Sequence, residues 1–221
     1  MSVVKKSEVW FQFLLASFLS FIVVSNIITG KLIQLGPFTV PGATVLYPFT
    51  FLITDLVGEI WGKERGYRLV LWGFYGNIIL LLASVFIIWA PAPGFFESQA
   101  AYEIVLGATP RIVLGSMVAY LLSQVHDVWS FAFWKGVTKG RHKWIRNNLS
   151  TMSSQIIDTG VFVFIAFYGI VPNAALWQIA SSQYVLKFLI ALADTPVFYW
   201  ISGILQRNAL EEGEQMGFEE G

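Results

Sequence analysis

The chain has 221 residues, of which 56% are hydrophobic and 13% are charged, whereas an ordinary soluble domain carries about 25% charged residues. Its formal net charge is zero, so overall charge gives no indication of nucleic-acid binding. It has no cysteine, which excludes disulfides, thiol catalysis and thiolate metal sites, and only two histidines, His126 and His142, which argues against a histidine-rich metal site. We expect no metal and no cofactor. A soluble core of this length could not contain so much apolar surface, so the composition predicts a polytopic membrane protein.

Six segments are long and apolar enough to cross a bilayer, which takes about 20 mostly apolar residues. They are residues 9–29, 43–61, 67–90, 109–134, 148–171 and 175–205. Lys5 and Lys6 precede the first segment, as in a signal peptide, but this apolar run is too long for one and no cleavage motif follows. We therefore predict an all-α bundle of six transmembrane helices that forms a single domain over residues 1–205.

Two connecting regions have their own composition. Residues 31–42, between the first two helices, contain short apolar runs on either side of Gly36-Pro37. This pattern predicts a small hairpin or short ordered loop, which we place at the outer surface. Residues 206–221 are rich in glutamate, and we predict a disordered cytoplasmic tail there.

The orientation follows from the lysines and arginines of the short loops. With six helices, 11 of the 14 basic residues fall on one side, at residues 5–6, 62–68, 135–147 and 207. The loops at 90–108 and 172–175 have none. Because basic residues mark the cytoplasmic side, both termini are predicted to lie in the cytoplasm.

The predicted helices contain ionisable side chains that are costly in a membrane, at about 2.5–3.5 kcal/mol each. They are Asp55, Glu59, Asp127, Asp158, Lys187 and Asp194. At 1.5 Å per residue, the carboxylates of Asp55 and Asp127 lie on the order of 10 Å from the cytoplasmic ends of their helices, and those of Asp158 and Asp194 about 15 Å. Four helices thus place a carboxylate at a similar depth, which suggests a polar cavity inside the bundle.

Amide side chains accompany two of these carboxylates on the same helical face. Gln124 lies three residues before Asp127, and Gln155 lies three residues before Asp158. Together with the ionisable residues they are our candidate substrate-binding groups.

Structural interpretations compete with this one. Glu59 could pair with Lys63 at the inner headgroups, Asp127 could pair with its neighbour His126, and Lys187 could form an ion pair with Asp158 or Asp194. Gly58-x-x-x-Gly62 favours close helix packing and is a candidate surface for a homodimer.

Motifs of several enzyme classes are missing. The sequence has no Gly-x-x-x-x-Gly-Lys-[Ser/Thr] loop for nucleotide hydrolysis, no His-Glu-x-x-His and no Gly-x-Ser-x-Gly. We therefore predict that the chain is not an enzyme. An intramembrane enzyme with paired carboxylates and the membrane-embedded binding subunit of an ATP-driven vitamin importer are the alternatives to a transporter.

The sequence resembles the queuosine precursor transporters, once grouped as vitamin uptake transporters. The resemblance covers roughly residues 20–205, and its signature is Pro48-Phe-Thr-Phe-Leu-Ile-Thr-Asp-Leu-Val-Gly-Glu-Ile-Trp-Gly-Lys63. The most specific element of this run is the spacing of Thr54-Asp55 and Glu59 with Gly62-Lys63. Val24-Ser-Asn26, Ser154-Gln-Ile-Ile-Asp-Thr159 and the segment from Lys187 to Asp194-Thr-Pro196 fit the same pattern.

The resemblance implies a multi-pass protein of the bacterial inner membrane that imports 7-cyano-7-deazaguanine and 7-aminomethyl-7-deazaguanine, precursors of a modified tRNA nucleoside. The chemistry of the candidate residues suits such a ligand. A buried carboxylate of Asp158 or Asp194 can accept hydrogen bonds from N1–H and the exocyclic amine. Asn26, Gln155 or Lys187 can donate to O6, and a second carboxylate can bind the aminomethyl cation.

Overall fold

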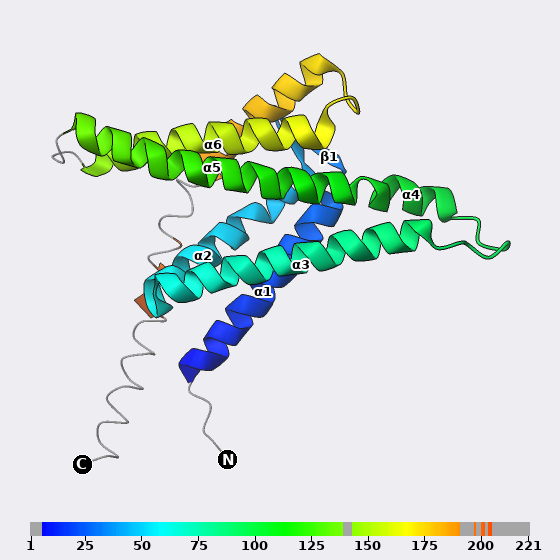
Figure 1. Cartoon of the computed structure of the whole chain (residues 1–221), viewed down its shortest axis with the longest axis horizontal. Coiled ribbons are helices and arrows are strands. Elements are labelled where there is room, and N and C mark those ends of the chain that lie inside the picture. The colour runs from blue at the N-terminus through cyan, green and yellow to red at the C-terminus, as the bar shows by residue number, and fades with distance from the viewer. Residues whose placement is uncertain (1–5, 139–142, 191–196, 198–199, 202, 205–221) are drawn as a thin grey trace, which may run out of the picture. The chain divides into compact units, whose positions relative to one another are not determined.

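The computed structural model describes residues 6–138, 143–190, 197, 200–201 and 203–204, and these are mostly helical (Figure 1). In chain order the elements are α1 (Lys6–Ile28), β1 (Leu32–Leu35), β2 (Phe38–Pro41), the short 3₁₀ helix η1 (Gly42–Val45), α2 (Tyr47–Trp61), α3 (Lys63–Trp89), α4 (Gln99–Gly107), α5 (Thr109–Val137) and α6 (Lys143–Phe167). Residues 173–190 form a further helix. Five of the six predicted segments coincide with helices, the sixth is helical at its described residues, and the predicted hairpin is present as β1 and β2.

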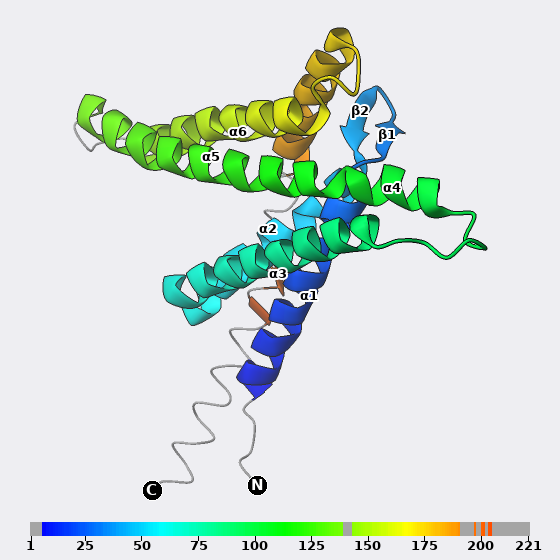
Figure 2. The same cartoon turned by 45° about the vertical axis from the view of Figure 1, so that its right-hand side comes forward.

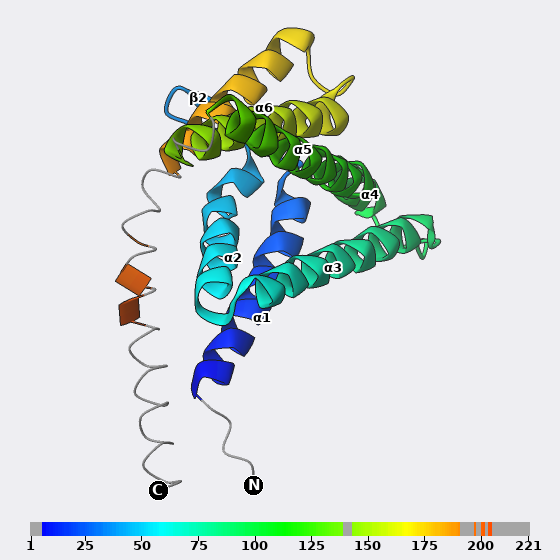
Figure 3. The ribbon, with the colours of Figure 1, turned by 60° about the vertical axis from the view of Figure 1, so that its left-hand side comes forward.

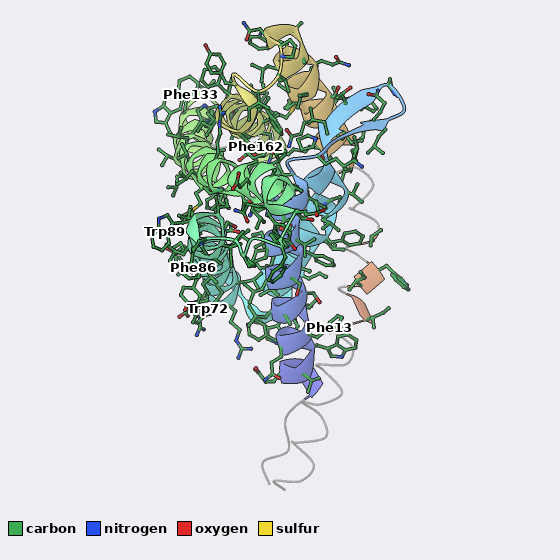
Figure 4. All side chains as sticks on the ribbon, turned by 90° about the vertical axis from the view of Figure 1, so that its right-hand side faces the viewer. Phe13, Trp72, Phe86, Trp89, Phe133 and Phe162 are labelled. Carbon is green, nitrogen blue, oxygen red and sulfur yellow. The ribbon has the colours of Figure 1, made fainter. Side chains whose placement is uncertain are left out.

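Three of the described helical stretches are long and apolar enough to cross a membrane: Ser7–Ile28, Lys63–Trp89 and Gln99–His126. The bulky side chains of α3 show why. Trp72, Phe86 and Trp89 are exposed and project away from the helix (Figure 4). Such exposed apolar surface is unfavourable in water and suits a lipid environment. The structure therefore supports a membrane protein, and six spans stay a prediction.

Two predicted loops are wrong. Residues 62–68 were expected to form a loop, but only Gly62 separates α2 from α3, because its φ of 87° turns the chain within one residue. Residues 90–108 were also expected to be a loop, yet they contain α4. That helix is nine residues long and buries no side chain, so its sequence lacks the long apolar run on which our prediction relied.

The chain divides into two compact units. The first contains the described residues of Met1–Ser25, Ala43–Leu80 and Phe188–Gly221, and the second those of Asn26–Gly42 and Leu81–Lys187. In the first unit, a buried cluster joins α1, α2 and the start of α3 (Figure 3). It consists of Leu14, Phe18, Ile53, Val57 and Leu69.

Glycines allow the helices of the first unit to approach closely. A Cβ on Gly73 of α3 would lie 2.8 Å from the ring of Phe18, and one on Gly66 would lie 3.5 Å from the Cα of Gly58. Gly58 thus packs against Gly66 of its own chain, whereas Gly62 ends α2. A Cβ on Gly58 or on Gly62 would meet no atom within 4 Å, so the described residues do not show the close packing predicted for Gly58-x-x-x-Gly62.

In the second unit, α5 and α6 pack along one another (Figure 1). Their shared core includes Ile112 and Ala119 of α5, Phe162 and Phe167 of α6, and Ile179 of the 173–190 helix. Arg111, near the start of α5, donates through Nε to the carbonyl of Ile165 and through Nη2 to that of Tyr168. These carbonyls belong to the C-terminal end of α6, where a cation is favourable.

The hairpin also belongs to the second unit. β1 and β2 pair antiparallel, with Leu35 opposite Phe38 and a turn at Gly36, whose φ is 57° (Figure 2). The backbone N–H of Thr39 donates to Ser182 Oγ at 3.3 Å, and Gln178 Nε2 donates to Thr39 Oγ1 at 3.0 Å. The hairpin is therefore ordered by its contacts with the 173–190 helix, and not by its turn alone.

Candidate functional site

An ion pair joins α6 to the 173–190 helix. The ammonium Nζ of Lys187 lies 2.8 Å from Asp158 Oδ2 and 3.4 Å from Thr159 Oγ1. The side chains of Lys187 and Asp158 are 10% and 22% exposed. Of the two partners that the sequence offered to Lys187, the structure thus shows Asp158, while Asp194 lies outside the described residues.

Local sequence explains why these two residues meet. After α6, Gly169 adopts a φ of 77°, which ends the helix, and Pro172 begins the next one, with the amide of Ala175 donating to its carbonyl at 2.9 Å. The short connection returns the 173–190 helix to α6, where Ile179 is buried against the core residues of that helix. Lys187 is two turns beyond Ile179 on the same face, and it reaches Asp158.

Uncharged polar side chains surround the pair. We call Ser154, Gln155, Asp158, Thr159, Gln183 and Lys187 the polar strip. Thr159 and Gln183 are each 1% exposed, and Ser154 is also buried. The carbonyl oxygens Oε1 of Gln155 and Gln183 are buried and have no hydrogen-bond partner among the described residues. Since such an acceptor costs about 1–3 kcal/mol when it is unsatisfied, the strip has the capacity to bind a donor.

The other predicted residues are distributed over several elements. Asn26 is buried near the end of α1 and takes part in a polar contact. Gln124 is exposed on α5; Asp127 follows it on that helix, but its side chain lies outside the described residues. Asp55 and Glu59 are exposed on α2, in the first unit. The alternative pairing of Glu59 with Lys63 is not formed between these two described side chains.

Gln183 and Arg111 were not among the predicted site residues. Gln183 lies four residues before Lys187, so its position on the same helical face was available from the sequence, but no charge drew attention to it. Arg111 lies near the start of α5. Its role as a cap depends on the packing of α5 against α6, which no local pattern shows.

The pair offers two neighbouring hydrogen-bonding functions. Lys187 donates and Asp158 accepts, so together they match a neutral ligand that presents an acceptor beside a donor on one planar edge. No group of three potential His, Asp or Glu metal ligands occurs within the described part of the chain.

Comparison with protein families gives a match over residues 41–201 to the family described as "putative vitamin uptake transporter". Three bacterial proteins are also similar over most of their length. A "probable queuosine precursor transporter" of Bacillus subtilis (strain 168) is 33% identical over 181 residues, which are 80% of this chain and 78% of the relative.

The "queuosine precursor transporter" of Escherichia coli (strain K12) is 30% identical, with 76% of this chain and 75% of that protein aligned. A "probable queuosine precursor transporter" of Haemophilus influenzae is 27% identical over 85% of this chain and 83% of its own. No solved structure matches the chain.

Proposed function

Since the chain belongs to the vitamin uptake transporter family and is homologous to queuosine precursor transporters, we propose that it imports 7-cyano-7-deazaguanine and 7-aminomethyl-7-deazaguanine. It is a membrane transporter and not an enzyme. We place it in the inner membrane of a bacterium, with the substrate held in a polar cavity inside the helix bundle.

The observation that best supports this class of substrate is the ion pair between Lys187 and Asp158. A deazaguanine presents the O6 acceptor next to the N1–H donor, with the exocyclic amine as a second donor. Lys187 can donate to O6 while Asp158 accepts from N1–H and the amine, because acceptor and donor sites lie side by side in the pair. The ligand would thereby form hydrogen bonds with both members of an ion pair that is already formed.

Other predicted residues complete the proposed site. Gln155 lies one helical turn from Asp158, so its carboxamide can also donate to O6, and Asn26 is a further donor. A second carboxylate is needed to bind the aminomethyl cation. The candidates for this function are Asp55, Glu59, Asp127 and Asp194, with Gln124 beside Asp127, and amide variants of the four carboxylates would identify it.

The test of function is complementation. Bacteria that lack both queuosine biosynthesis and their own importer should regain queuosine-modified tRNA when they express the chain and receive 7-cyano-7-deazaguanine. The control is the same strain with an empty vector. Unmodified tRNA, with the protein detected in the membrane, would contradict the proposed function.

The orientation is tested by reporter fusions. Fusions at Lys143 and after Gln206 should report the cytoplasm, and a fusion at Ser98 should report the periplasm, because of the distribution of basic residues. A cytoplasmic signal at Ser98 would contradict the six-span arrangement. A homodimer through the Gly58 and Gly62 face stays a prediction.

A further inference from the structure

Gln183 is a buried polar residue of the 173–190 helix. Its side chain is 1% exposed, and its Oε1 has no hydrogen-bond partner among the described residues. Gln178, on the same helix, differs because its Nε2 binds Thr39 of the hairpin. A buried acceptor without a donor is unfavourable, so the fold alone does not explain a glutamine at position 183.

The neighbours of Gln183 on its own helix show where it lies within the polar strip. Ile179, four residues earlier, is fully buried in the core with Phe162, and Lys187, four residues later, binds Asp158. Residues four apart lie on one helical face, so Gln183 lies between the apolar core and the ion pair. It is separated from Lys187 by one turn, about 6 Å along the helix axis.

The chemistry of the proposed substrate identifies a donor for this acceptor. If Lys187 and Asp158 bind O6, N1–H and the exocyclic amine, the remaining ring donor of a deazaguanine is the pyrrole N–H at position 9. The neighbouring N3 is an acceptor, so one carboxamide can accept from N9–H through Oε1 and donate to N3 through Nε2. An offset of one helical turn corresponds to the opposite end of such a bicyclic ring.

We infer that Gln183 is a specificity-determining residue that accepts a hydrogen bond from the pyrrole N–H of the deazaguanine base. The inference rests on the proposed function, and it adds a selection rule to it. A base with a free N9–H satisfies the buried oxygen, whereas a nucleoside carries a sugar in place of that proton. The transporter thus selects free bases over nucleosides at this position.

The experiment measures uptake of labelled 7-cyano-7-deazaguanine in cells that cannot synthesise it, with two unlabelled competitors. One is 7-deazaguanine, and the other is its furopyrimidine analogue, in which an oxygen replaces the pyrrole N–H with little change in size. The native chain should prefer 7-deazaguanine by about 5- to 150-fold, which corresponds to one buried polar group left without a partner. In the Gln183→Met and Gln183→Leu variants, the two analogues should compete equally well with the labelled substrate. The matched variant Gln178→Met should keep the preference for 7-deazaguanine.

Each result that would contradict the expectation points to a different claim. No uptake by the native chain would contradict the proposed function itself. Normal uptake with equal competition by the two analogues would overturn the role of N9–H. A preference that persists in Gln183→Met would overturn the role of Gln183. Removal of an unpartnered acceptor should not impair folding, so loss of both Gln183 variants from the membrane would also overturn the inference.

Discussion

Two ion pairs of the same length show different degrees of exposure. Arg65 Nη1 of α3 lies 2.8 Å from Glu8 Oε1 of α1, and Lys187 Nζ lies 2.8 Å from Asp158 Oδ2. The side chains of Arg65 and Glu8 are 32% and 39% exposed, and the guanidinium of Arg65 also lies 4.9 Å from the ring centre of Phe11. The side chains of Lys187 and Asp158 are 10% and 22% exposed, and this pair has buried polar neighbours.

The difference shows which charges need a functional explanation. A pair whose side chains are about a third exposed contributes about 0–1 kcal/mol. Burial of two charges costs several kcal/mol per ion, so an apolar pair of similar volume is often at least as stable. Asp158 and Lys187 therefore carry a desolvation cost, and the substrate binding that we propose would account for it. Arg65 and Glu8 require no such explanation.

The largest effect is expected when one partner of the buried pair is removed. Lys187→Met and Asp158→Asn should each lower membrane yield and stability, by about 3–5 kcal/mol, because a buried charge is left without its partner. The double variant should recover much of the stability but not the uptake. Yield, thermal unfolding in detergent and uptake of the precursor measure these outcomes. A double variant with normal uptake would remove the pair from the site.

Gln155 provides a neutral test beside the same pair. Gln155→Leu should leave the membrane yield unchanged, because its Oε1 has no partner to lose. Without the amide donor, the apparent affinity for the precursor should fall by about 5- to 150-fold. The concentration dependence of uptake checks this prediction, and an unchanged affinity would remove Gln155 from the proposed site.

Arg111 distinguishes a structural charge from a binding one. Its donors bind the carbonyls of Ile165 and Tyr168, so Arg111→Met should destabilise the end of α6 by about 1–2 kcal/mol. The affinity for substrate should stay unchanged in the protein that reaches the membrane. Thermal unfolding and uptake normalised to protein amount are the measurements, and a specific loss of affinity would show that the cap also supports the site.

The smallest effect is expected at the exposed pair. Glu8→Gln should change stability by less than about 1 kcal/mol, with no effect on uptake, and the small change should decrease further at high salt. This variant is also the control for those in the buried pair. A loss of uptake as large as that of Lys187→Met would mean that burial does not separate functional from structural pairs in this chain.

Much of the fold could be predicted because it depends on composition and on long apolar runs. Five of the six predicted segments coincide with helices, the sixth is helical at its described residues, and the hairpin around Gly36 follows from its turn residues. The starts of α3 and α4 could not be placed. Gly62 turns the chain at a single residue, and α4 is too short to show a periodic apolar pattern.

The site was only partly predictable. Depth and helical spacing selected Asp158, Gln155 and Lys187, but the choice between Asp158 and Asp194 as partner of Lys187 depends on how two helices pack. Gln183 was missed because an uncharged amide in an apolar helix carries little energetic signal in the sequence. Its importance appears only when its burial and its unpartnered oxygen are known.

The joint at Gly62 has a consequence for the biogenesis of the protein. α2 has 15 residues, with Asp55 and Glu59 among them, and is a weak candidate for independent insertion into a membrane. A single residue links it to α3, whose first turns carry Lys63, Arg65 and Arg68. We therefore expect α2 to enter the bilayer together with α3, with the basic residues at their shared corner on the predicted cytoplasmic side. Lengthening this one-residue joint should then make the insertion of α2 less efficient.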